Sequence, residues 1–257
     1  MKKTAVILCG GKGSRLGLLG KKYNKSLIKV QNREILWYII KNFQKHGFNN
    51  FILPLGYKSR QIKRFLIRNK NFNTNIDVVN TGANTSIGKR IALVLNKIKS
   101  ENFILLNGDA IFEFDVNRII QEHMKRKVAV TFMVTEITYQ YGTVGIVNGK
   151  VVDFKRDVVY EALKLRNKSK YNAFNYSGIS IINTKLLRKM KSQCLRAKNF
   201  EMEIYPKLIK KKGALMRRIK GFWHSIDNVK DIKAVNDKKT LKNKYTDLRK
   251  IKNKLLI

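Results

Sequence analysis

The sequence predicts an α/β fold in which helices flank a mostly parallel sheet. Short apolar runs, typical of buried strands, alternate with segments whose apolar residues recur at helical spacing. Strands that are joined through helices favour right-handed crossovers and parallel pairing. The chain of 257 residues is long enough to bury a substantial core, and no Pro/Gly/Ser-rich linker divides it.

The first half of the chain predicts four strands with helices between them. The helix predicted over 34–46 carries a face of Ile, Leu and Phe and stops before Gly47, a common helix cap. The other helices follow the same spacing of apolar residues. In order, the expected elements are strand 5–8, helix 34–46, strand 51–55, helix 58–68, strand 76–79, helix 88–99 and strand 103–106.

The second half has more strands and fewer clear helices. Two apolar runs around Asn148-Gly149 predict a hairpin, since Asn-Gly is a preferred two-residue turn. Residues 155–175 carry no readable pattern. The expected elements are strand 128–135, hairpin strands 144–147 and 151–154, strand 178–182, helix 201–211, strands 215–219 and 222–226, and a lysine-rich helical tail from Asn228.

The chain is strongly basic. Lys and Arg number 55 against 17 Asp and Glu, which gives a formal net charge of +38 that attracts anions of any kind. The lysines are spread along the whole length and are not interleaved with aromatic residues in a stripe. A solvated basic surface is therefore favoured over a dedicated nucleic-acid site.

The cysteines and the N-terminus bear on the compartment. Cys9 and Cys194 are too few for a disulfide framework, and residues 1–4 lack a signal-peptide pattern. No apolar stretch reaches the ~18 residues that a membrane span needs. We expect a cytoplasmic protein without a membrane span.

A glycine-rich turn follows the first predicted strand. Gly10, Gly11 and Gly13 offer bare backbone N–H groups to a polyphosphate, and Arg15 adds a fixed positive charge. The spacing excludes a Walker loop and matches the dinucleotide fingerprint only approximately, because no acidic residue ends strand 51–55. The turn predicts a nucleotide-phosphate site, and an ordinary left-handed turn is the alternative.

Two aspartates suit a hard metal ion. Asp109 follows strand 103–106 after a glycine, and Asp227 follows the aromatic run of strand 222–226. Mg²⁺ is usually held by one or two carboxylates together with substrate phosphates. Because the glycine turn, residues 80–90 and residues 107–109 all follow strand ends, we expect them to converge on one site. The alternative is that Asp109 makes a turn bond and Asp227 caps the helix near Asn228.

A family resemblance rests on these same residues. Gly10-Gly11-Lys12-Gly13-Ser14-Arg15-Leu16, followed by Asn24-Lys25-Ser26, resembles the Gly-Gly-x-Gly-Thr-Arg-Leu and Pro-Lys-Pro motifs of the sugar nucleotidyltransferases. Further matches lie in 35–41, 55–63, 79–90, 108–109 and 221–227. Within that family the chain is most similar to the glucose-1-phosphate cytidylyltransferases, because 81–90 lacks the Gln-rich loop of the uridylyl and thymidylyl relatives.

The resemblance implies a Rossmann-like fold and a reaction. It implies a single domain over 1–257, with a nucleotide-binding half of about 1–127 and an acceptor-binding half with a helical tail over about 128–257. The expected substrates are CTP, or another nucleoside triphosphate, and a sugar 1-phosphate; Mg²⁺ is the expected cofactor, and self-association is expected. Guanylyl, thymidylyl or uridylyl transfer, transfer to a non-sugar phosphate, and a non-catalytic nucleotide- or RNA-binding protein on the same fold are the alternatives.

The resemblance also implies residue roles. Arg15, Lys25 and Asp109 would be catalytic, and Asp109 and Asp227 would hold the metal. The nucleotide would contact Leu8, Gly10, Gly11, Gly13, Ser14, Arg15, Lys25, Thr81, Gly82, Arg90 and Gly108.

The acceptor side departs from the family pattern. Where the family has Glu-Lys-Pro after the hairpin, this chain has Lys155-Arg156-Asp157, so Lys155 or Arg156 would grip the sugar phosphate. The family's Asn-Gly-Gly sugar-contact motif is replaced by Tyr176-Ser177-Gly178, which would line the acceptor site instead.

Overall fold

A computed structural model describes most of the chain. The described residues are 2–236 without 136, 139–142, 148–149, 156–158, 161, 164–170 and 173, and the side chains of Asn71 and of 136–173 fall outside the description. The predicted roles of the Lys155 side chain and of Arg156 therefore lie outside the described residues.

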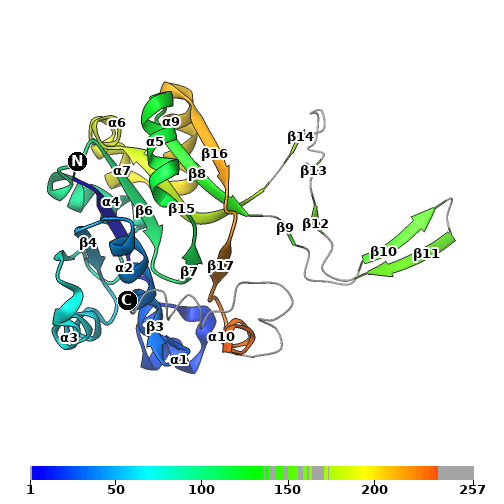
Figure 1. Ribbon diagram of the computed structural model, residues 1–257, viewed down its shortest axis with the longest axis horizontal. Helices are drawn as coiled ribbons and strands as arrows, with labels where there is room; N and C mark the ends of the chain where they lie inside the picture. The colour runs from blue at the N-terminus through cyan, green and yellow to red at the C-terminus, as the bar shows by residue number, and fades with distance from the viewer. Residues whose placement is uncertain are drawn as a thin grey trace.

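A seven-stranded sheet forms the centre of the molecule (Figure 1). Its order is β16-β8-β15-β6-β1-β4-β5, and every neighbouring pair is parallel except the two pairs made by β15. The mostly parallel α/β sheet predicted from the sequence is confirmed. The strands are β1 (Thr4–Leu8), β4 (Asn50–Leu55), β5 (Asn75–Asn80), β6 (Asn102–Asn107), β8 (Val130–Thr135), β15 (Asn175–Asn183) and β16 (Ala214–Arg218).

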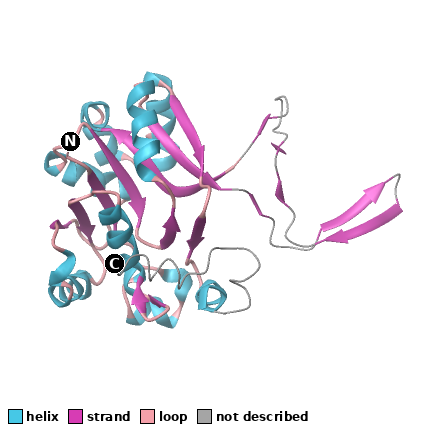
Figure 2. Ribbon diagram, viewed as in Figure 1, coloured by secondary structure: helices cyan, strands magenta, loops and turns pink. Residues whose placement is uncertain are grey.

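Helices cover both faces of this sheet (Figure 2). Along β1, Ala5 and Ile7 point into one core cluster and Val6 into the other, because successive strand residues face opposite sides. The first cluster contains residues of α2 (Ile35–Lys45), α3 (Ser59–Arg68) and α5 (Val116–Arg126). The second contains residues of α4 (Ile87–Val94), α6 (Thr184–Lys189), α7 (Lys191–Arg196), α8 (Phe200–Glu203) and α9 (Tyr205–Lys212).

The order of the strands places a crevice beside β1. The chain runs from β1 outward to β4 and β5, then returns through α4 to β6 on the other side of β1. In open α/β sheets, ligands bind beyond the carboxyl ends of the strands at such a switch point.

Short strand pairs lie outside the main sheet. The pair β7 (Ala110–Glu113) and β17 (Phe222–Ser225) joins the segment after β6 to the C-terminal part of the chain. The predicted hairpin is confirmed as β10 (Thr143–Val147) and β11 (Lys150–Lys155). The remaining pairs are β2 (Lys29–Val30) with β3 (Arg33–Glu34), β9 (Ile137–Thr138) with β12 (Val159–Tyr160), and β13 (Ala162–Leu163) with β14 (Tyr171–Asn172).

Several elements differ from the sequence prediction. The helix expected over 88–99 ends at Val94 and continues as a 3₁₀ turn. The helix expected over 201–211 is divided into α8 and α9, because Pro206 in the first turn of α9 has no N–H to continue α8. The sequence reading missed β7, α5, α6 and α7. The expected tail helix is present as α10 (Val229–Asn236), and the residues beyond it are not described.

Among the described helices, none combines the length and apolarity that crossing a bilayer requires. Both cysteines are buried, and each is a free thiol.

A buried histidine joins α5 to the sheet. The ring of His123 lies between the Thr131 hydroxyl (Nδ1 to Oγ1, 2.8 Å) and the Asn102 side-chain oxygen (Nε2 to Oδ1, 3.1 Å). Because that amide oxygen can only accept, Nε2 carries the proton of the neutral ring and Nδ1 accepts from Thr131. Burial lowers the pKa of His123 to about 4.

We expect this histidine to destabilise the protein in mild acid. Its pKa falls from 6.5 to about 4 on folding, so the unfolded chain binds more protons between those values. The contribution is fully present above pH 6.5 and is lost as the pH falls through that window. Between pH 7 and 4.5, wild type should lose about 2 to 3 kcal/mol more unfolding free energy than His123→Gln in urea titrations. Parallel pH profiles would contradict this.

Candidate functional site

A cavity of about 650 Å³ opens at the carboxyl ends of β1, β5 and β6. The segments that follow these strands form its wall together with the 3₁₀ turn η2 (Lys25–Leu27). Of the residues predicted to bind nucleotide, those on the cavity are Leu8, Gly10, Gly11, Gly13, Arg15, Lys25, Arg90 and Gly108, and Asp109 lies beside them. The three loops expected to converge do lie around one cavity.

The glycine-rich turn closes one end of the cavity. Gly13 has a φ of 63° and begins the 3₁₀ turn η1 (Ser14–Leu16), in which the Leu16 N–H donates to the Gly13 carbonyl at 3.0 Å. Such a left-handed φ favours glycine. The short helix α1 (Leu18–Lys22) follows at once. Ser14, predicted to contact the nucleotide, is not among the residues on the cavity wall.

A buried arginine holds the strand-end loops together. Arg90 is 4% exposed, and its guanidinium donates to the carbonyls of Gly10 (3.1 Å) and Leu55 (3.2 Å). It also donates to the Thr81 hydroxyl at 2.6 Å and to the Ala83 carbonyl at 3.2 Å. A side chain on Gly10 would collide with this guanidinium, so the glycine is required where β1 ends.

The Arg90 contacts change two of the predicted roles. Thr81 is buried, and its hydroxyl donates to the Leu55 carbonyl at 2.7 Å while accepting from Arg90. Neither Thr81 nor Gly82 lies on the cavity wall; the next residues, 83–87, do. The loop 80–90 was expected at the site, but none of residues 83–87 was assigned a role, because their side chains carry no charge and match no motif.

A buried asparagine positions the turn that carries Lys25. The Asn24 side chain is 1% exposed and donates to the carbonyls of Cys9 and Tyr57, both at 3.0 Å. Its oxygen accepts from the Ser26 N–H at 3.0 Å and so caps η2. Asn24 therefore fixes η2 to the ends of both β1 and β4.

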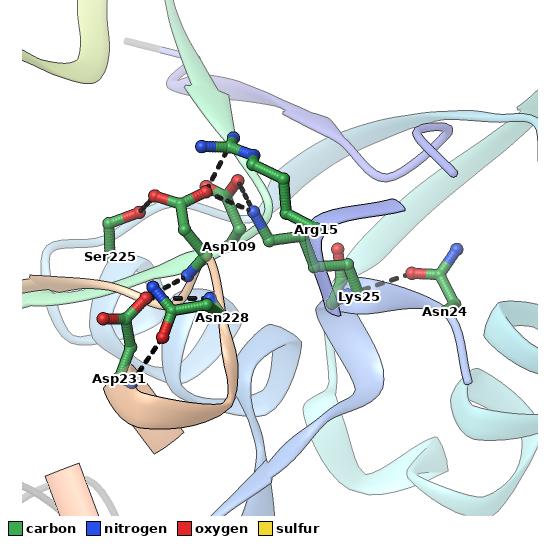
Figure 3. A network of polar contacts seen from close by, with 9 residues as sticks. Arg15, Asn24, Lys25, Asp109, Ser225, Asn228 and Asp231 are labelled. Atoms are coloured by element: carbon green, nitrogen blue, oxygen red, sulfur yellow. Dashed lines mark hydrogen bonds and ion pairs between the residues drawn. The ribbon is translucent and has the colours of Figure 1, made fainter. Parts of the chain in front are cut away.

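Lys25 joins the two predicted metal ligands. Its ammonium donates to Asp109 Oδ2 at 2.7 Å and to Asp227 Oδ1 at 2.8 Å. Figure 3 shows the polar network around Lys25 and Asp109. The guanidinium of Arg15 contacts the same Asp227 oxygen at 2.8 Å. The Lys25 side chain is 14% exposed and that of Arg15 is 73% exposed, so the lysine contacts are the less screened.

The β7–β17 pair brings Asp227 to Asp109. Ser225 pairs with Ala110, and the Ile226 N–H donates to the Asp109 carbonyl at 2.9 Å. The Ser225 hydroxyl then donates to Asp227 Oδ2 at 2.9 Å. These contacts hold the second carboxylate beside the first, although the two are far apart in the sequence.

Asp227 does not cap the helix that follows it. The Asn228 side chain accepts from the N–H groups of Lys230 (2.8 Å) and Asp231 (3.1 Å), so it is the cap of α10. Asp231 in turn accepts from the Asp227 and Asn228 N–H groups (Figure 3). The capping alternative for Asp227 is therefore wrong, and its carboxylate is available to cations.

The electrostatic surroundings favour ionised Asp227. Burial alone raises the pKa of this carboxyl, but the hydrogen bond and charge of Lys25 outweigh it. The Ser225 hydroxyl and Arg15 act in the same direction, and the pKa of Asp227 lies below its ordinary value.

Cys9 also lines the cavity, but burial raises the pKa of its thiol to about 12. The thiol therefore stays protonated at neutral pH and does not act as a nucleophile.

The two carboxylates fit a hard divalent cation. Within the described residues, no group of three or more His, Cys, Asp or Glu side chains could hold a metal. Two converging carboxylates beside an open, basic cavity are the donor set that Mg²⁺ takes when phosphate oxygens supply other ligands.

Three of the predicted acceptor residues, Tyr176, Ser177 and Gly178, do not line this cavity. The Tyr176 ring packs edge-on against Phe132, and its hydroxyl bonds that of Tyr205 at 2.8 Å. The Ser177 hydroxyl donates to the Met133 carbonyl at 2.7 Å. Gly178 lies in a bulge of β15 against the Asn107 side chain. None of the three is on the cavity wall, and the side-chain polar groups of the first two are already used within the protein.

The chain matches a known family model along almost its whole length. The model described as nucleotidyl transferase matches residues 4–241. A Bacillus subtilis (strain 168) protein, named as a probable glucose-1-phosphate cytidylyltransferase, is 27% identical over 252 residues, which cover 90% of this chain and 94% of the relative. Mannose-1-phosphate guanylyltransferase 1 of Arabidopsis thaliana is 28% identical over 238 residues, covering 88% of this chain and 62% of the relative.

A solved structure shares the fold. A Bacillus anthracis protein assigned as a glucose-1-phosphate thymidylyltransferase, in complex with a sucrose, superposes with a TM-score of 0.71 at 17% identity. The match covers 91% of this chain and 94% of that chain.

We expect Asn24 to be a main determinant of stability at this site. Replacement by Ala would leave the buried Cys9 carbonyl, the partly buried Tyr57 carbonyl and the Ser26 N–H without their partner, which costs about 2 to 4 kcal/mol. Urea unfolding measures the loss. Asn84→Ala, an exposed asparagine on the same cavity, is the matched control and should change the unfolding free energy by less than about 0.5 kcal/mol. Equal effects of the two substitutions would argue against the Asn24 role.

Proposed function

Because the chain belongs to the nucleotidyl transferase family, we propose that it transfers a nucleoside monophosphate from a nucleoside triphosphate to a sugar 1-phosphate. The proposed donor is CTP, and pyrophosphate is the second product. The observation that carries the proposal is the convergence of Lys25, Asp109 and Asp227 at the edge of the glycine-walled cavity.

The charge of the cavity suits a triphosphate. Its described wall contains Lys12, Arg15, Lys25 and Arg90 against a single acid, Asp109. Backbone N–H groups of the glycine turn add donors that can approach phosphate oxygens closely. The sequence reading assigned Gly10, Gly11 and Gly13 to this task, and that assignment stays a prediction.

Lys25 and Arg15 are the proposed catalytic cations. In the transfer, an oxygen of the sugar 1-phosphate forms a bond to the α-phosphorus while the bond from this phosphorus to the bridging oxygen breaks. Pyrophosphate leaves with that electron pair, so no covalent enzyme intermediate is needed. The side chains contribute by positioning both anions and by neutralising the charge that develops on the phosphate oxygens.

Asp109 and Asp227 are the proposed metal ligands. A Mg²⁺ ion held by them would bind phosphate oxygens and neutralise part of their charge. Arg90 and Asn24 act through the loops they hold, since their side-chain donors are spent on backbone carbonyls and a hydroxyl.

The relatives support two donors. The Bacillus subtilis relative, which the match covers over 94% of its length, is named for cytidylyl transfer, and this favours CTP. The Arabidopsis relative is named for guanylyl transfer at a similar identity, so GTP is the second candidate.

Asp109→Asn should lower transfer by roughly a hundredfold or more, because the neutral amide binds a divalent cation poorly. Pyrophosphate release from CTP and glucose 1-phosphate, with Mg²⁺, measures this. Asp77→Asn is the control: Asp77 lies on β5 and pairs at 3.9 Å with Lys97 away from the cavity, so activity should be unchanged. Full activity of the Asp109 variant would overturn the assignment.

A panel should identify the donor. Each of the four nucleoside triphosphates is crossed with a set of sugar 1-phosphates and other small phosphomonoesters, and pyrophosphate is read out. We expect CTP to give the highest rate. Product from GTP alone would move the assignment to guanylyl transfer. No turnover with any pair, together with salt-sensitive RNA retention that Asp109→Asn leaves intact, would favour the non-catalytic binder.

A further inference from the structure

The ammonium of Lys25 occupies the place between the two proposed metal ligands. It contacts one oxygen of each carboxylate, Asp109 Oδ2 at 2.7 Å and Asp227 Oδ1 at 2.8 Å. These are short, charge-assisted hydrogen bonds. A divalent cation bound to these two oxygens would need the position that the Lys25 ammonium occupies, so the two cations exclude each other.

The charges around these oxygens already balance. Two carboxylates face two cations, since Arg15 also contacts Asp227 Oδ1. A site whose negative charge is neutralised from within has little net attraction for a free divalent cation. Partial burial strengthens the Lys25–Asp109 ion pair by reducing its screening by water, since the Asp109 side chain is 23% exposed and that of Lys25 only 14% exposed.

The ammonium of Lys25 has an alternative set of partners in the cavity. Its side chain also lines the cavity, and two of its three N–H groups serve the carboxylates while no described residue accepts the third. A polyphosphate in the cavity would offer several acceptors to this flexible side chain. The turn beneath it is held by Asn24, so the ammonium can change partners while the backbone stays in place.

We propose that Lys25 closes the two-carboxylate site to free divalent cations, and that the site opens only when a polyphosphate draws the ammonium away. The site then takes its divalent cation together with the nucleotide. The inference rests on the proposed function for the identity of the polyphosphate. It rests on the Lys25 contacts alone for the closed state.

The test measures Mn²⁺ binding to the full-length protein without any nucleotide or phosphate, from the electron paramagnetic resonance signal of free Mn²⁺. Wild type should bind weakly at this site. Lys25→Met keeps a long unbranched side chain and removes the charge, so the affinity should rise about tenfold or more. Lys25→Arg keeps the charge and should stay weak.

Two controls locate the effect. Lys12→Met removes a cation that lines the same cavity but contacts neither carboxylate, and should leave Mn²⁺ affinity within about twofold. In the triple variant with Lys25→Met, Asp109→Asn and Asp227→Asn, the gained binding should disappear. Thermal unfolding of each variant verifies that it is folded, and added Mn²⁺ should raise the melting temperature of Lys25→Met more than that of wild type.

Two results would overturn the inference: Lys25→Met binding Mn²⁺ no more tightly than wild type, or tighter binding that survives loss of both carboxylates. Failure of the proposed function is a separate outcome, since it would appear as no turnover on the substrate panel while the Mn²⁺ result still stood.

Discussion

The pairing of β7 with β17 is the constraint on which the site depends. One register places Ser225 opposite Ala110, and the next residues then join through the Ile226 N–H and the Asp109 carbonyl. A slip of one residue along this pair would turn alternate side chains to the other face. The carboxylates of Asp109 and Asp227 would then no longer reach a common cation. A backbone alignment outside the main sheet thus fixes the distance between two acidic groups.

Two buried polar side chains fix the remaining geometry. The guanidinium of Arg90 is buried, and its hydrogen bonds to three carbonyls and a hydroxyl offset the cost of removing its charge from water. Asn24 does the same without charge. An unsatisfied hydrogen-bonding group in the interior costs free energy, and a shift of any segment held by Arg90 or Asn24 would break some of these bonds. The result is a fixed frame beside the exposed cation Arg15.

The sequence predicted the parts of this site that follow strand ends. The glycine turn and Asp109 follow clear apolar strands, so their meeting followed from parallel topology. Asp227 reaches them through the antiparallel β7–β17 pair outside the main sheet, and Lys25 was assigned through the family motif. Arg90 was expected to contact the nucleotide, but its guanidinium ties loops together, because the sequence does not show which charged side chain is buried. Tyr176 was assigned by motif position, but the aromatic packing with Phe132 and Tyr205 decides where its ring lies. Helix α5 was missed although Asp115 caps it and Val116, Ile119 and Ile120 lie at helical spacing.

The two-stranded β7–β17 ribbon has a consequence for the cooperativity of unfolding. Phe222 and Ile226 are 1% and 0% exposed, and they belong to the same core cluster as Ala5 and Ile7 of the central strand β1. A segment that is buried in a core opens only together with the elements packed against it. The carboxylate pair therefore persists for as long as this core cluster stays folded.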